Sequence, residues 1–229
     1  INYLRKKMKH FTLPLIACLA LSACSTFDPY TGEEKTTNTA KGAGIGAGVA
    51  AVVAYIANKD EDDIGKRNRR ILQAATGGAA IGGGIGYYMD TQEAELRKQL
   101  RGSGVSVERD GNNINLIMPG NITFSSSKAN IEQNFYSVLD SVVLVLKEFD
   151  KTLIVVAGHT DSSGSDALNQ GLSVQRAQSV SGYLSAAGIL NDRIESIGFG
   201  ETQPVANNNT EAGKELNRRV EITLLPIAE

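Results

Sequence analysis

An acidic, an amide and a guanidinium side chain stand at spacings that could form one ligand site. Asp161 follows a continuous apolar run, residues 153–157, which has the length of a strand buried on both faces. Open α/β sheets bind ligands there, beyond the carboxyl ends of their strands. Arg176 follows on a predicted helix, where its planar guanidinium can hold a carboxylate through two hydrogen bonds. Asn169 precedes Arg176 by two helical turns, so both side chains project from one face.

Neither charged residue is specific by itself. An aspartate after a strand is often a turn or helix-capping residue. An arginine on a helix is usually solvated, or it belongs to a surface ion pair of small energy. The surrounding elements and motifs therefore decide whether Asp161 and Arg176 form a site.

Hydrophobic patterns in the last part of the chain indicate which elements would position these side chains. The predicted elements are a strand hairpin at 105–108 and 114–118, a helix from Asn130 to Phe149, a strand at 153–157, a helix at 166–187, and strands at 194–199 and 220–224. The strand–helix–strand unit from 153 to 199 predicts parallel pairing with a right-handed crossover. The expected fold class is therefore α/β, a small mixed sheet with helices packed on it (an α+β sandwich).

The two predicted helices have their own local signals. Asn130, with Gln133 three residues later, can cap the first helix. The second helix is expected to end at Gly188 and to place four apolar side chains on the core. These four side chains are Leu168, Leu172, Val180 and Leu184.

An ordered set of motifs joins these elements. The chain reads G-H-T-D-S-S-G from Gly158, L-S-V-Q-R-A from Leu172 and N-R-R-V-E-I from Asn217. This set resembles the OmpA-like C-terminal domain, the peptidoglycan-binding module of outer-membrane proteins and lipoproteins, over roughly residues 105–225. The resemblance implies a βαβαβ(β) fold and binding of the cell wall.

The resemblance also implies roles for individual residues. Peptidoglycan of the diaminopimelate type offers an ammonium and a carboxylate on one carbon of its stem peptide. The resemblance places the ammonium on Asp161 and the carboxylate on Arg176, with Asn169 assisting. Arg218 and Arg219 belong to the N-R-R motif, and one of them is expected to face the pocket.

One position departs from the family pattern. Family members often carry an aspartate directly after the phenylalanine at the exit of the first strand, whereas Phe124 is followed here by Ser125. Ser125 offers a hydroxyl in place of a charge, which puts the edge of the pocket and its affinity in question.

Other function classes find little support. His159, Asp161, Ser162 and Ser163 invite a hydrolase interpretation, but the chain has no G-x-S-x-G motif, no H-E-x-x-H motif and no cysteine nucleophile. We therefore expect no enzyme and no catalytic residues. A net charge of −2 gives no electrostatic support for nucleic-acid binding. Two His and two Cys are too few for a zinc site of those residues, and no metal or cofactor is expected.

The first residues are typical of a targeting signal. A basic stretch and an apolar run at 11–21 precede Leu-Ser-Ala-Cys, which resembles a bacterial lipobox with Cys24 as the acylated residue. Whether translation starts at Ile1 or Met8 stays open, as does an ordinary secretory signal that leaves a free thiol. Ser25 does not resemble the Asp of inner-membrane retention, so lipid anchoring in the outer membrane, with the C-terminal domain in the periplasm, is expected.

Two glycine-rich runs lie between the signal and the domain. They predict a helical hairpin packed through small residues, resembling the glycine-zipper segments of envelope proteins. The glycines on its packing faces are Gly44, Gly48, Gly78 and Gly82. A flexible linker is an alternative, and a dinucleotide-binding loop is disfavoured because no strand precedes the first run.

The whole layout predicts five segments and resembles small lipoproteins of the YiaD type. The segments are a lipoprotein signal peptide (1–23), a tether (24–41), a glycine-zipper-like hairpin (42–88), a linker helix that serves as an exposed stalk (89–102) and the OmpA-like domain (103–229). The expected function is a non-covalent tether between outer membrane and wall. The alternative is a membrane-associated homo-oligomer formed by the hairpin, with the domain only as a wall anchor.

Overall fold

The computed structural model describes residues 26–27, 34–35, 50–56, 84–125 and 127–227. The chain divides into two units, Ile1–Thr37 and Asn38–Glu229. In the described residues of the first unit, β1 (Thr26–Phe27) pairs with β2 (Glu34–Lys35) in antiparallel orientation. Everything below concerns the second unit.

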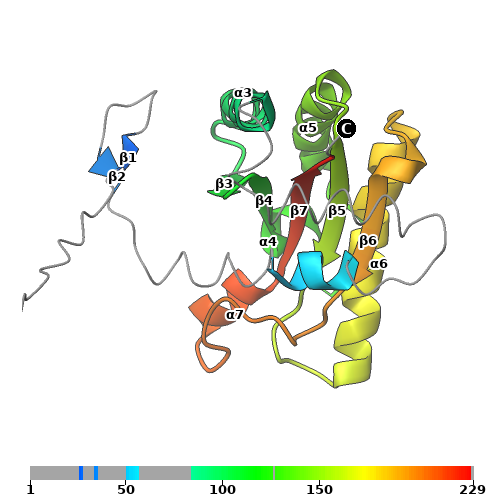
Figure 1. Cartoon of the computed structure of the whole chain (residues 1–229). Coiled ribbons are helices and arrows are strands. Elements are labelled where there is room, and N and C mark those ends of the chain that lie inside the picture. The colour runs from blue at the N-terminus through cyan, green and yellow to red at the C-terminus, as the bar shows by residue number, and fades with distance from the viewer. Residues whose placement is uncertain (1–25, 28–33, 36–49, 57–83, 126, 228–229) are drawn as a thin grey trace, which may run out of the picture. The chain divides into compact units, whose positions relative to one another are not determined.

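A five-stranded mixed sheet forms the centre of the second unit. Its strands are β3 (Ser106–Asp110), β4 (Asn113–Pro119), β5 (Thr152–Gly158), β6 (Ile194–Gly198) and β7 (Arg219–Pro226). Their order across the sheet is β3-β4-β7-β5-β6, as Figure 1 shows. All neighbours are antiparallel except β5 and β6, which run parallel. The predicted hairpin and the predicted parallel strand–helix–strand unit are both confirmed.

Helices cover one face of this sheet. The longer ones are α3 (Gly84–Gln99), α5 (Tyr136–Glu148) and α6 (Asp166–Ala186); the short ones are α4 (Gly120–Thr123), α7 (Glu211–Asn217) and the 3₁₀ turns Gln133–Phe135 and Asn191–Arg193. Leu139 and Val180 of α5 and α6 share one core with Leu116, Val156 and Ile222 of the strands. The α/β fold class is therefore confirmed.

Two glycines bring α6 unusually close to the sheet. A Cβ at Gly158 of β5 would lie 2.1 Å from the carbonyl oxygen of Ser173, and a Cβ at Gly198 of β6 would lie 2.5 Å from the Ser173 Oγ. Only glycine fits at such distances. The start of α6, which carries Asn169 and Arg176, is thereby held directly over the carboxyl ends of the parallel strands.

Substituting Gly158 by alanine is expected to destabilise the domain by about 1–3 kcal/mol or more, because backbone must move to relieve the overlap. Gly171, on the exposed face of α6, has nothing within 4 Å of its added Cβ. Gly171→Ala is therefore the matched control, expected to be neutral or stabilising by up to about 1 kcal/mol. Urea unfolding followed by circular dichroism measures both. Equal effects of the two substitutions would contradict the close-approach argument.

Two details of the predicted helices are wrong. α5 begins after the turn at Gln133–Phe135, and Phe135 rather than Asn130 precedes its first residue. Leu168, expected on the core face of α6, is 71% exposed. Buried polar side chains, and not Leu168, take the inward face of the first half of α6. They are Asn169, Ser173 and Arg176.

The helix before the domain is not an exposed stalk. α3 begins at Gly84, inside the predicted second glycine run, and its Met89 and Leu96 are fully buried in the main core. Leu100, just after the helix, belongs to the same core. An i, i+7, i+11 apolar stripe therefore packs α3 onto the domain. The helix is part of the folded unit.

Several predictions fall on residues outside the described ranges. These are the signal peptide at 1–23, the acylation of Cys24 and the packing of Gly44, Gly48, Gly78 and Gly82. Among the described residues, no helix has both the length and the apolar character that a membrane crossing needs.

Candidate ligand-binding site

Asp161 lies just beyond the end of β5, in a loop held by backbone hydrogen bonds. The His159 N–H donates to the Arg219 carbonyl and the Thr160 N–H to the Gly200 carbonyl, both at 2.9 Å. One carboxylate oxygen of Asp161 accepts from the Ser163 N–H at 2.8 Å. Only 6% of Asp161 is exposed. The carboxylate is thus fixed and shielded at the sheet edge where the sequence predicts it.

Arg218 pairs with this carboxylate. Its Nη1 donates to Asp161 Oδ2 at 2.6 Å, and its Nη2 donates to Glu211 Oε1 at 2.9 Å. Burial by itself raises the pKa of Asp161, but hydrogen bonds from Arg218 and Ser163 and the attraction of the Arg218 charge together lower it below its ordinary value. Asp161 is therefore an anion at neutral pH.

Arg176 is a buried cation with unused donors. Only 4% of it is exposed, its Nε donates to the Lys128 carbonyl at 3.0 Å, and its guanidinium lies 5.1 Å from the Phe124 ring centroid. Its two terminal nitrogens make no hydrogen bond to the described residues. Burial, then repulsion by Arg218, lowers the pKa of Arg176, while attraction to Asp161 acts in the opposite direction. The guanidinium thus shares one electrostatic environment with Asp161.

Asn169 lies at the Asp161 end of the candidate site. Its amide donates to the Asp161 carbonyl at 3.2 Å and to Glu201 Oε2 at 2.5 Å. Ser165 caps the helix by accepting from the Leu168 N–H, which fixes where α6 begins. The structure therefore brings together Asp161, Asn169 and Arg176 as the sequence predicts. Glu201 is an addition that sequence reasoning missed.

The two arginines of the N-R-R motif have different environments. Arg219 is 2% exposed, and its Nε donates to Glu221 Oε1 at 2.6 Å within the sheet. Arg218 is the one that reaches Asp161. Successive residues of a strand point to opposite sides, so the start of β7 separates the two side chains. Arg218 pairs with Asp161 of the candidate site, whereas Arg219 pairs with the buried Glu221.

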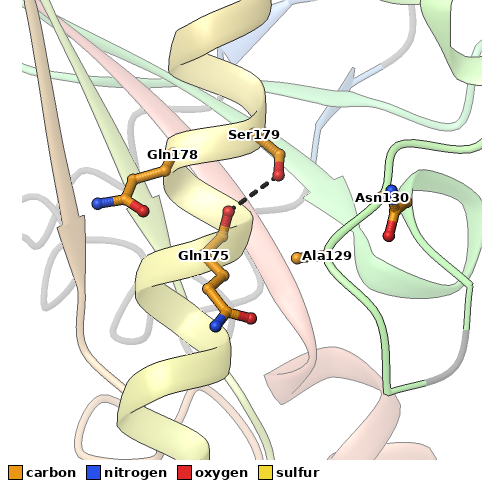
Figure 2. A pocket seen from close by; sticks show the side chains of 5 residues that line it. All are labelled: Ala129, Asn130, Gln175, Gln178 and Ser179. Carbon is orange, nitrogen blue, oxygen red and sulfur yellow. Dashed lines mark hydrogen bonds between the residues drawn. The ribbon is translucent and has the colours of Figure 1, made fainter.

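Two cavities flank the cluster. One, of about 360 Å³, lies beside Arg176, and Figure 2 shows its lining residues on α6 and on the loop that faces it. They are Ala129, Asn130, Gln175, Gln178 and Ser179, all polar except the alanine. The other, of about 490 Å³, lies beside Asn169 and includes Asp166, Gln170 and Glu201. Neither cavity includes Asp161 or Arg176, but both offer hydrogen-bonding groups near the cluster.

The remaining sequence candidates do not extend the charged cluster. The Ser125 hydroxyl donates to the Glu132 carboxylate. His159 is 1% exposed and stacks on Phe199, and burial followed by repulsion from Arg219 holds its pKa well below the ordinary value. A neutral, enclosed imidazole has no access to Ser162. Within the described ranges, no group of His, Cys, Asp and Glu side chains could hold a metal ion.

Removing the Arg218 charge is expected to raise the pKa of Asp161. Its hydrogen bond is what most opposes the effect of burial on that carboxyl, so Arg218→Gln leaves only the Ser163 hydrogen bonds to lower the pKa of Asp161. A carboxyl-selective NMR titration of the full chain measures the shift. Glu211→Gln, which removes the exposed partner of Arg218 and keeps the Arg218–Asp161 bond, is the control. An unchanged Asp161 titration in Arg218→Gln would contradict the assignment.

The fold and the site together define a class. A mixed five-stranded sheet holds a shielded aspartate–arginine pair beyond the carboxyl ends of its parallel strands, the place where open α/β sheets bind ligands. The OmpA family model matches residues 123–218, and the model of the YMGG-like Gly-zipper matches residues 6–92. The chain belongs to the OmpA family and carries a glycine-zipper segment ahead of the OmpA domain.

Individual relatives agree with this assignment. The chain is 45% identical to the probable lipoprotein YiaD of Escherichia coli K12, over 98% of this chain and 100% of that protein. It is 38% identical to the peptidoglycan-binding protein ArfA of Mycobacterium tuberculosis, over 48% of this chain and 34% of ArfA. The solved cell wall anchor of the T6SS from Pseudomonas aeruginosa superposes with a TM-score of 0.53 and 30% identity, covering 57% of this chain and 96% of that one.

Proposed function

We propose that the C-terminal domain binds peptidoglycan without a covalent bond, by holding the ammonium and carboxylate of diaminopimelate in the stem peptide. The observation that carries the proposal is the Arg176 guanidinium, which is buried, oriented by Lys128 and Phe124, and left with unused donors beside an ionised Asp161. A zwitterion needs one anion and one cation in a shielded pocket. The names of ArfA as a peptidoglycan-binding protein and of the T6SS cell wall anchor support binding of the cell wall.

The ammonium of diaminopimelate must take the place of Arg218 at the Asp161 carboxylate. About a third of the Arg218 side chain is exposed, and Glu211 is its second partner. When an ammonium reaches Asp161, Arg218 can shift toward Glu211 without losing all its pairing. The Asp161 carboxylate is thus paired before binding, which avoids the cost of a lone buried carboxylate.

Lipid anchoring at Cys24 would complete a tether. Acyl chains on Cys24 would hold the outer membrane while the domain holds the wall from the periplasm. The relatives named as lipoprotein and as outer membrane protein A support a place in the envelope. Many copies on one membrane make tethering multivalent, so each domain can bind weakly. The buried His159 supports a role without catalysis, because it offers no base to Ser162 or Ser163.

Sedimentation with purified sacculi tests the proposal. The full chain, kept soluble in detergent, is expected to sediment with diaminopimelate-type peptidoglycan, and free diaminopimelate is expected to release it. Lysine-type peptidoglycan is the matched control, because its side chain ends in an ammonium without a carboxylate. Equal binding to both wall types would contradict recognition of the zwitterion. Replacing Cys24 by serine is expected to abolish labelling with a palmitate analogue.

A further inference from the structure

The face of the sheet turned away from α5 and α6 is buried as well. Alternate residues of a strand point to opposite faces, so Leu153, Val155 and Ala157 of β5 point away from the main core. These three and Leu225 of β7 are 0% exposed and form a second apolar cluster. We call these four residues the apolar strip.

A short helix in the glycine-rich segment, residues 50–56, covers the apolar strip. Val52 and Ile56 are 0% and 1% exposed, and both belong to the same cluster as the strip. Val53 and Tyr55 pack against its margin, whereas Ala54 is exposed. The i, i+4 pair therefore faces the sheet and the opposite side of the turn faces solvent. Residues 50–56 appear in cyan in Figure 1.

We propose that the apolar strip is an intramolecular docking surface whose occupant is the segment 50–56. Val52 and Ile56 cannot be buried in a lipid bilayer and against the strip at the same time. Docking therefore holds this part of the glycine-rich segment on the domain and competes with its insertion into the membrane. The segment that resembles a membrane hairpin by composition thus acts as a cover for the sheet.

Docking also limits how far the chain between Cys24 and the domain can extend. This consequence rests on the proposed lipid anchor, whereas the docking proposal itself does not rest on that anchor. With Val52 on the sheet, the chain from Cys24 to the domain can extend at most about 100 Å. With the segment released, the domain first holds the chain at Gly84, the start of α3, and the limit becomes about 200 Å. Docking and release would thus set two different upper limits on the distance between the membrane and the wall-binding domain.

A single tryptophan tests the docking, since the natural chain contains none. Tyr55→Trp places a reporter at the margin of the strip; Val53→Trp is the second probe. In the full chain, acrylamide is expected to quench this tryptophan weakly. Val52→Asp, added to the probe variant, is expected to raise quenching several-fold and to increase binding of a dye for apolar surfaces. Ala54→Asp, two residues away on the exposed side, is the matched control and should change neither signal.

Vesicles of phosphatidylethanolamine and phosphatidylglycerol that contain brominated lipid decide between the two locations. If the segment is docked, bromine does not quench the tryptophan in the probe variant that keeps Val52. Replacing Val52 by serine in that variant releases the segment to the membrane, and bromine then quenches the tryptophan. Bromine quenching in the wild-type background, or equal acrylamide quenching of the Val52→Asp and Ala54→Asp variants, would overturn the proposal. Sacculus sedimentation is read separately, so failure of wall binding leaves the fluorescence result interpretable.

Discussion

Replacing Arg176 by lysine is expected to remove most of the wall binding although the positive charge is kept. The guanidinium is oriented by its Nε bond to the Lys128 carbonyl and by the Phe124 ring, so its remaining donors form a fixed fork for a carboxylate. A lysine ammonium is a point charge that cannot make this bond and the two-pronged contact together. Loss of one charge-assisted hydrogen bond costs about 1.5–3 kcal/mol, about a tenfold to hundredfold weakening.

A sedimentation titration against sacculi measures this loss, and Arg97→Lys is its control. Arg97 lies on α3, where it pairs with Glu93 four residues before it, and the same exchange there should leave binding unchanged. Unfolding by urea should separate lost binding from lost folding. If Arg176→Lys sediments as well as wild type, the carboxylate is not held by this fork and the site assignment is wrong.

The sheet was predictable because its strands carry strong local signals. The turn at Gly111, the apolar run that became β5 and the alternation in β7 each specify one element. The parallel pairing of β5 and β6 followed from the helix that connects them, and the hand of that crossover follows from chirality. The elements that were missed, α4 and α7, are short, and contacts distant in sequence hold them, such as the hydrogen bond from the Gly120 N–H to the Arg218 carbonyl at 2.7 Å.

The helices show why hydrophobic pattern alone misplaces a functional face. The spacing of Leu168 predicts a core position, yet Asn169 and Arg176 take the inward positions, where they donate hydrogen bonds to the carbonyls of Asp161 and Lys128. The sequence offered Asn130 as a helix cap, but in the structure this residue is exposed and a 3₁₀ turn, Gln133–Phe135, follows it. The helix α5 starts only after that turn. At such places function overrides local preference.

The site was predictable only where a motif marked it. Asp161, Asn169 and Arg176 stand on two neighbouring elements, and the motif gave their order. The choice of Arg218 over Arg219 needed the strand geometry, since either could reach the pocket in a bare sequence. Glu201 comes from the loop after β6, and the G-F-G-E sequence there was the signal that could have found it.

Replacing Asp161 by asparagine is expected to weaken wall binding by about a hundredfold or more. The amide keeps the shape of the carboxylate and removes its charge, so the incoming ammonium has no anion and Arg218 loses its partner. Breaking a shielded charge pair costs about 3 kcal/mol. Asp150→Asn makes the same change at an exposed residue just before β5, at the opposite end of that strand from Asp161, and should bind like wild type.

Acid adds an independent test of the same carboxylate. The pKa of Asp161 lies below its ordinary value of 3.8, so the anion and its binding contribution are fully present above that value and are lost only as pH falls through the lowered pKa. In Arg218→Gln the pKa of Asp161 rises, so wall binding should fail at a higher pH than in wild type. Asp161→Asn should show no acid transition from this group, because nothing there titrates. Sedimentation across a pH series compares the three chains; one shared midpoint would mean that another group, and not Asp161, receives the ammonium.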